Sequence, residues 1–353
     1  MRISSMMIYE QIKKGLQNSL EELSRRNEEL ATGRRILKPS DDITSSSRAL
    51  GYKVEISMKE QYLRNMATGD LQFEFTDNVL KSLSDALVEL RKLTISGVNP
   101  QDEGARLFNS QQARLLRDHL YELSNSRHLG RFIFSGMRTD REAFVYNPLT
   151  YTYEYQGDSG EMGLPLNTNA TVSINMPGSE VFSPVLRSGN PSVLSDGTSV
   201  TYTESKDPLT GVNTITIEIG DLMSAEHDVF TVTNIMDIAN RLSYAWQYED
   251  IDGSFIGETK AMHRIEALQS LIDDARTQVL EKQTELATRR QFLKGAEERT
   301  RNLLNTLKNT LSLSEDADLP EVAVEIQKAQ TGLEALRISS IKLLSTSLLD
   351  FLK

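Results

Sequence analysis

The sequence predicts a mainly α-helical protein with a β-rich insertion in its middle. Three observations support this class. Both ends of the chain carry apolar residues at the three- and four-residue spacing of an amphipathic helix. At about residue 131 the apolar period changes to two, as in strands. From residue 259 onward the helical period returns. Because an apolar helix seam is unstable in water, each terminal helix needs a partner helix.

The first predicted helix covers residues 5–32 and ends near Gly33, since glycine commonly follows the last turn of a helix. Its apolar residues recur every three or four positions, with Asn27 in the same seam. The predicted seam consists of Tyr9, Leu16, Leu20, Leu23 and Leu30.

A short connection follows this helix. Pro39 disfavours helical geometry at Lys38. Ser40 or Asp41 is expected to cap the helix that follows, and the acidic pair Asp41 and Asp42 suits its N-terminus. Three consecutive serines make residues 43–50 a weak and irregular start.

Three long helices are predicted in the interior of the chain, over residues 52–97, 103–128 and 259–312. The last of them would form a rod of roughly 80 Å at 1.5 Å per residue. For these helices we favour an intramolecular role, as the core of one helical bundle.

The segment between them has the pattern of short strands. Residues 145–155 alternate around Asn147-Pro148, which indicates a hairpin, and residues 200–219 indicate a second hairpin around 207–211. Further strands are expected at 171–174 and 229–232, with a short helix at 236–246.

The last predicted helix runs from residue 320 to the end, after a break at 314–318. Asp318 with Glu321 resembles a capping box. The apolar seam shifts by one residue after Leu336, as in a straight helix within a bundle. Its members are Val322, Ile326, Ala329, Leu333 and Leu336, followed by Ile341, Leu344, Leu348 and Phe351 or Leu352.

The net negative charge of the chain is concentrated in its middle. The whole chain has a net charge of −11, whereas residues 145–258 contain sixteen acidic and three basic residues, a net charge of −13. The helical remainder therefore sums to +2 and can pack laterally without strong repulsion, while the acidic middle is expected to stay solvated. This distribution argues against nucleic-acid binding, which requires a basic surface.

The chain contains no cysteine. Two readings stay open: chance absence in a cytosolic protein, or a protein threaded unfolded through a secretion channel, where a disulfide would obstruct transit. Neither a Sec-type signal peptide nor a transmembrane segment is expected, because long apolar runs are absent.

We find no sequence pattern of an enzyme. The four histidines are scattered, the GxSxG and GxxxxGK[ST] motifs are absent, and residues 250–254 lack the ligands of a calcium loop. Catalytic, cofactor and metal sites are therefore not predicted. The sequon at Asn169 carries little weight because such tripeptides arise by chance.

Several segments resemble one known family. Residues 30–42, LATGRRILKPSDD, are similar to the stretch after the first helix of flagellin-like axial proteins of the bacterial flagellum. Residues 132–140 (FIFSGMRTD) and 155–158 (YQGD), with both chain ends, resemble the hook–filament junction branch of that family. A filament flagellin is the alternative, although flagellins usually carry Asn-Ser-Ala or similar residues where this chain has Lys38-Pro39-Ser40.

The resemblance implies a non-enzymatic building block located outside the cell in the flagellum. It would be exported unfolded by the flagellar type III apparatus, after a cytoplasmic chaperone has held its C-terminal helix. Its copies would associate in a ring between hook-associated protein 1 and the first layer of flagellin. An additional adhesive role of the acidic middle is a further hypothesis.

Three layers are expected. Residues 1–42 and 315–353 would pair as an inner-tube assembly domain, in which ordering is coupled to packing between molecules. Residues 43–135 and 259–314 would form a rod-like helical bundle, and residues 136–258 an acidic β-rich outer domain. The candidate assembly residues are Leu16, Leu20, Leu23, Leu30, Arg34, Arg35, Asp41, Asp42, Leu333, Leu336, Leu344 and Leu348.

Overall fold

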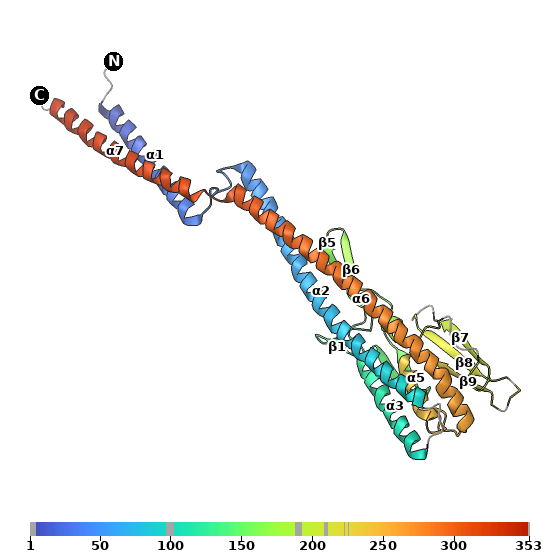
Figure 1. The fold of residues 1–353 in the computed structure, drawn as a ribbon. Helices are drawn as coiled ribbons and strands as arrows, with labels where there is room; N and C mark the ends of the chain where they lie inside the picture. Colours follow the sequence, from blue (N-terminus) through green and yellow to red (C-terminus); the bar gives the residue numbers. More distant parts are fainter. Residues whose placement is uncertain are drawn as a thin grey trace. The chain divides into compact units, whose positions relative to one another are not determined.

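The computed structural model describes residues 5–96, 102–187, 193–207, 211–221, 223–224 and 226–351. The predicted class is confirmed: along the chain, long helices precede and follow a smaller region of short strands (Figure 1). The chain divides into two compact units, Met1–Gln61 with Arg299–Lys353 and Tyr62–Glu298. The boundaries fall inside the two longest helices, α2 (Ile43–Ser96) and α6 (Glu258–Glu315).

The first unit contains α1 (Ser5–Thr32) and α7 (Leu319–Phe351), which pack against each other. It also contains the first turns of α2 and the last turns of α6. The expectation of an irregular start at 43–50 is wrong, because α2 is helical from Ile43. The cap is Asp42 rather than the predicted Ser40 or Asp41, because the helix begins one residue after Asp42. The amide of Ser45 donates to Asp42 Oδ1 at 3.0 Å, which stabilises the turn despite the serines.

The described part of the second unit also contains α3 (Glu103–Ser124), α4 (Gly178–Val181) and α5 (Ile235–Ala245). The predicted helix 103–128 is too long, since α3 ends at Ser124. The cause is Asn125, whose side chain exchanges two hydrogen bonds with the backbone of Phe144, at 2.8 and 3.0 Å. An amide that pairs with a distant strand in this way favours the end of the helix.

All strand pairs are antiparallel. Both predicted hairpins are confirmed, β3–β4 and β7–β8, and β9 extends the second into a three-stranded sheet in the order β7-β8-β9. β5 was not predicted, because Pro165 obscures the alternating pattern of this strand. The strands are β1 (Arg127–His128), β2 (Arg131–Phe132), β3 (Phe144–Asn147), β4 (Thr152–Tyr155), β5 (Gly163–Asn167), β6 (Ala170–Ser173), β7 (Val200–Lys206), β8 (Asn213–Ile219) and β9 (Asp228–Val232).

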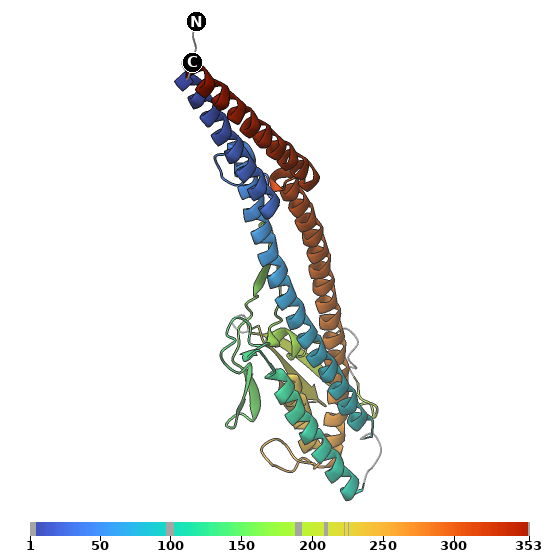
Figure 2. The same cartoon turned by 90° about the vertical axis from the view of Figure 1, so that its left-hand side faces the viewer.

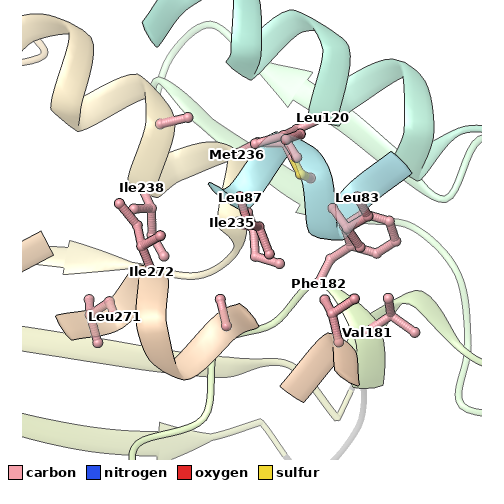
Figure 3. Packing of buried hydrophobic residues seen from close by; sticks show 14 of the residues in the cluster. Leu83, Leu87, Leu120, Val181, Phe182, Ile235, Met236, Ile238, Leu271 and Ile272 are labelled. Carbon is pink, nitrogen blue, oxygen red and sulfur yellow. The ribbon is translucent and has the colours of Figure 1, made fainter. Parts of the chain in front are cut away.

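One hydrophobic cluster in the second unit joins helices and strands (Figure 3). Residues of α2, α3, α5 and α6 converge there with Phe182, which follows α4. The alternating buried residues of β8 add the sheet to this core. The labelled core residues are Leu83, Leu87, Leu120, Val181, Phe182, Ile235, Met236, Ile238, Leu271 and Ile272.

A buried carboxylate fixes the start of α5. Asp237 is 1% exposed and accepts a hydrogen bond from the amide of Tyr153 in β4 at 3.0 Å. Thr233 and Asn234, just before the helix, donate to the same side chain. Burial raises the pKa of Asp237 to about 6, against the opposing effect of these hydrogen bonds. The carboxylate thereby joins β4 to the N-terminus of α5.

Basic side chains of α6 bind the acidic middle of the chain. Arg264 contacts both Asp228 and Asp250, at 2.5 to 3.0 Å. Lys282 lies 2.7 Å from Glu180. These two cations are eighteen residues apart, five turns of helix, so they share one face of α6. Part of the acidity that we expected to be solvated therefore stabilises the packing of the β-rich region on this helix.

Candidate assembly interface

The predicted pairing of the terminal helices is observed within the first unit. α1 and α7 run antiparallel, and the first turns of α1 lie beside the last turns of α7 (Figures 1 and 2). Val322 and Ile326 of α7 are 5% and 8% exposed, and Leu16 and Leu23 of α1 are half-buried. Each helix thus buries one apolar stripe against the other.

An ion pair network supports the same seam. Glu29 is fully buried and is contacted by Arg25 and Arg26 of its own helix. Arg26 also reaches across to Glu325 of α7 at 2.8 Å. The hydrogen bond to Glu29 is the largest cause that raises the pKa of Arg26. The charge of Glu29 is therefore compensated in the seam rather than left unpaired.

The structure separates the predicted leucines into two groups. Leu16, Leu23 and Leu333 are half-buried. Leu20, Leu30 and Leu336 are 53%, 43% and 36% exposed, so a large part of each side chain stays in contact with water. Leu344 and Leu348 belong to α7, but their side chains lie outside the described residues. The apolar spacing therefore predicted both leucines that are half-buried and leucines that remain exposed, without distinguishing them.

A second apolar face is exposed on α7. Val324, Ile338 and Ile341 are 51%, 51% and 61% exposed. Val324 follows the buried Val322 by two residues, about 200° around the helix. A hollow of about 450 Å³ lies on this helix around Gly332, lined also by Val324 and Ala335. The α1–α7 pair thus buries one face of α7 and leaves another apolar face in contact with water.

The connection between α1 and α2 crosses the break between α6 and α7. Arg34 forms an antiparallel β-bridge with Asp316. The amide of Arg35 donates to Glu315 O at 2.8 Å, and the amide of Ala317 donates to Gly33 O at 2.9 Å. Gly33 has φ of +68°, which places the chain in the conformation that this turn requires. We call these two crossing segments, 33–42 and 314–318, the joint.

The four charged residues predicted at the joint have different roles. Arg34 lies 3.3 Å from Glu315, and the Arg35 guanidinium donates to Ser314 O at 3.2 Å. Asp41 accepts hydrogen bonds from the amides of Leu37 and Lys38. Asp42 caps α2, and the hydrogen bonds from Ser45 lower its pKa. Arginines therefore join the two segments, whereas the aspartates shape the backbone of one of them.

Glu315 at the centre of the joint was missed by sequence reasoning. Its side chain is 9% exposed and contacts Arg34 and Lys53, with Lys53 Nζ at 2.7 Å. It joins the connection, the start of α2 and the end of α6. The sequence offered one signal for it. Glu315 is an acidic residue near a helix end, and the segment that crosses it, residues 33–42, begins with two arginines after Gly33.

Glu315→Ala is expected to lower the free energy of local opening at the joint by about 1 kcal/mol. The loss is small because the partners of Glu315, Arg34 and Lys53, are half-exposed and can rehydrate. Hydrogen exchange at the amides of Arg35 and Ala317 should accelerate about fivefold, as these amides donate across the joint. The matched control is Glu89→Ala, which removes the exposed pair of Glu89 with Lys92. Unchanged exchange at both amides would contradict this role of Glu315.

The two motifs that resemble the junction branch meet in the second unit. Asp158 accepts hydrogen bonds from the amides of Met137 and Gly160, at 2.8 and 2.9 Å. The Tyr155 hydroxyl lies 2.9 Å from the carbonyl oxygens of Phe134 and Asp158, and burial raises its pKa. Residues 132–140 and 155–158 thus form one loop clamp.

The described residues contain no group of three or more histidine, aspartate or glutamate side chains placed to hold a metal ion. Across the same described part of the chain, no helix is long and apolar enough to cross a membrane.

Comparison with known proteins identifies relatives in the bacterial flagellum. Residues 3–139 match the bacterial flagellin N-terminal helical region. The chain is 29% identical over 197 residues to flagellar hook-associated protein 3 of Salmonella typhimurium, covering 54% of this chain and 60% of that protein. It therefore spans about 60% of the length of this curated relative. The predicted resemblance to the flagellin-like axial proteins is confirmed.

Solved structures share the fold. A flagellar hook-associated protein 3 from Legionella pneumophila is 18% identical, with a TM-score of 0.57 over 74% of this chain and 97% of that chain. A putative flagellar hook-associated protein from Vibrio parahaemolyticus is also 18% identical, with a TM-score of 0.58 over 78% and 99%. The names of these relatives are those of flagellar components rather than enzymes, in agreement with the predicted non-enzymatic role.

Proposed function

Because the chain resembles hook-associated protein 3, we propose that it is a structural component of the bacterial flagellum. Its copies form a ring at the hook–filament junction, between hook-associated protein 1 and flagellin. The flagellar type III apparatus exports it unfolded, and a cytoplasmic chaperone holds the C-terminal helix beforehand. The absence of cysteine supports such transit. Its final location is outside the cell.

The exposed apolar face of α7 is the observation that carries this proposal. Ile338 and Ile341 are half or more exposed, although α7 already has a partner in α1. Exposed apolar patches of this kind mark surfaces that bind other proteins. Neighbouring subunits in a ring would cover them, as they would cover Leu20 and Leu30 on α1. The same contact would bury Leu344 and Leu348, which remain predicted assembly residues.

The three-layer division forms part of the proposal. Residues 1–42 and 315–353 line the inner tube, residues 43–135 and 259–314 form the rod-like bundle, and residues 136–258 face outward. The joint supports the first boundary, since both crossing segments lie there.

Ile338→Asp in cells that lack their own copy of this chain tests the proposal. The substitution should not unfold the monomer, because the side chain is 51% exposed. It should prevent lateral packing, since a carboxylate would be desolvated in the subunit interface. We expect the exported variant and unpolymerised flagellin in the medium, and at least a tenfold loss of filaments counted by electron microscopy.

The matched control is Leu149→Asp, which changes an 89% exposed leucine in the β3–β4 turn. This variant should support normal filaments. Normal filaments on cells that contain only the Ile338→Asp chain would contradict an assembly role for the α7 face.

A filament flagellin is the second candidate, favoured by the match of residues 3–139 to the flagellin N-terminal region. Quantitative immunoblotting of purified flagella distinguishes the two. A junction protein is present in tens of copies per flagellum, whereas a filament subunit is present in thousands.

A further inference from the structure

A groove of about 470 Å³ lies beside the joint in the first unit. Its apolar wall includes Ile36, Pro39, Ile43 and Leu50. Ile43 and Leu50 are 77% and 65% exposed. They lie seven residues apart and so share one helix face, and such an apolar stripe is usually buried. Hollows of roughly 300–1,000 Å³ accept groups as large as several apolar side chains.

Basic residues surround this groove. Arg34, Lys38 and Lys53 line it, and the carboxylate among its described lining residues, Glu315, already contacts Arg34 and Lys53. Residues 34–53 contain five basic and two acidic residues, a net charge of +3. The groove therefore suits an apolar side chain that is flanked by carboxylates.

The end of α6 and the turn after it have that composition. Leu313 is 86% exposed and Leu319 is 46% exposed. Asp316 and Asp318 lie between them and are exposed. Residues 309–327 contain five acidic residues and no basic residue. We call residues 313–319 the acidic turn.

The groove and Leu313 of the acidic turn lie on different sides of the end of α6. Glu315 lines the groove, and Leu313 is two residues earlier, about 200° around α6. Leu313 therefore points away from the groove of its own chain. A molecule with two complementary surfaces that face different directions binds its neighbours head to tail, and such contacts generate rings or helical arrays.

We propose that the groove of one copy binds the acidic turn of the next copy, with Leu313 in the apolar part and Asp316 near Lys38. The inference rests on the proposed ring and names the residues of one lateral contact in it. It is separate from the α7 face, which lies on another helix.

Cysteine crosslinking tests this contact, because the chain contains no cysteine of its own. A chain with both Leu50→Cys and Leu313→Cys replaces the native copy in cells, and purified flagella are oxidised. The same two substitutions, carried on separate purified full-length chains, are also mixed and oxidised. We expect a ladder of covalent oligomers from flagella and a heterodimer from the mixture, seen on non-reducing gels.

The controls are the single variants, which should give no ladder, and Leu149→Cys combined with Leu313→Cys. Lys38→Glu should reduce crosslinking about two- to fivefold, the size expected for one exposed ion pair. Adding Asp316→Lys should restore it.

Normal filaments without a ladder, together with no heterodimer in the mixture, would overturn this contact but leave the proposed function intact. Equal crosslinking by the Leu149→Cys control would also overturn it. Loss of junction function would instead appear with Ile338→Asp, whose test does not involve the groove.

Discussion

Gly136→Ala is expected to destabilise the second unit by roughly 2–5 kcal/mol. Gly136 has φ of +69°, a conformation that costs an L-residue about 1–2 kcal/mol. A Cβ added there would lie 2.2 Å from the carbonyl oxygen of Asp158 and 2.2 Å from its Oδ1. The backbone of the loop clamp must then move, which adds about 1–3 kcal/mol. Urea unfolding followed by circular dichroism measures the loss.

Gly130→Ala is the matched control in the same unit. Gly130 has φ of +79° in the β1–β2 turn, but an added Cβ would meet no heavy atom within 4 Å. This substitution should cost only the conformational part, about 1–2 kcal/mol. Equal losses in the two variants would show that the approach of Asp158 to Gly136 does not restrict residue 136.

The hairpins and most long helices could be predicted from local pattern alone. Apolar spacing determines that residues 5–32 form a helix, and the acidic pair Asp41 and Asp42 indicates a helix start, although the capping residue is Asp42 rather than the predicted Ser40 or Asp41. The period cannot determine which of two adjacent apolar stripes faces the partner within the chain. Leu16 and Leu20 fit one heptad seam equally well, yet one is half-buried and the other 53% exposed.

The misses arise where distant residues decide the local structure. α3 ends early because Asn125 pairs with Phe144, and Pro165 lies in a strand because β6 completes the pair. Glu315 is central to the joint only because the arginine segment, some 280 residues earlier, crosses it. None of these contacts leaves a periodic trace in the sequence.

Two basic residues of α6 that stand among its apolar positions are explained in the same way. Lys282 and Arg289 interrupt an apolar pattern, and the sequence gives no reason for them. In the structure Lys282 pairs with Glu180, and Arg289 donates to the backbone oxygen of Asn175 at 3.0 Å. The basic side chains of α6 therefore bind carboxylates and backbone oxygens of residues 145–258.

Arg264 has the strongest of these contacts, and Arg264→Leu is expected to cost about 3–5 kcal/mol. Its side chain is 4% exposed and donates to both carboxylates, Asp228 and Asp250, which are 11% and 28% exposed. Removing the guanidinium leaves two partly desolvated carboxylates facing each other, and breaking a buried pair in this way is costly. The free energy of unfolding in urea at pH 7 measures the effect.

The matched control is Arg187→Leu, which removes a bidentate ion pair with Glu281. The side chain of Glu281 is 60% exposed. Solvent screens this pair, so the loss should stay within about 1 kcal/mol. Comparable losses in the two variants would contradict the structural role of Arg264.

The pH dependence of the stability loss in Arg264→Leu distinguishes a lost ion pair from a packing defect. Hydrogen bonding to Arg264 lowers the pKa of Asp250 to about 2 from the ordinary 3.8, so its stabilisation is present above pH 4 and lost as pH falls toward 2. In Arg264→Leu the carboxylates lose that partner, although Arg241 stays 3.8 Å from Asp250. The pKa of Asp250 should then rise toward its ordinary value, and acidification should relieve the repulsion between the two carboxylates. The stability difference between the two proteins should therefore shrink from pH 7 to pH 3, whereas a simple cavity would keep it constant.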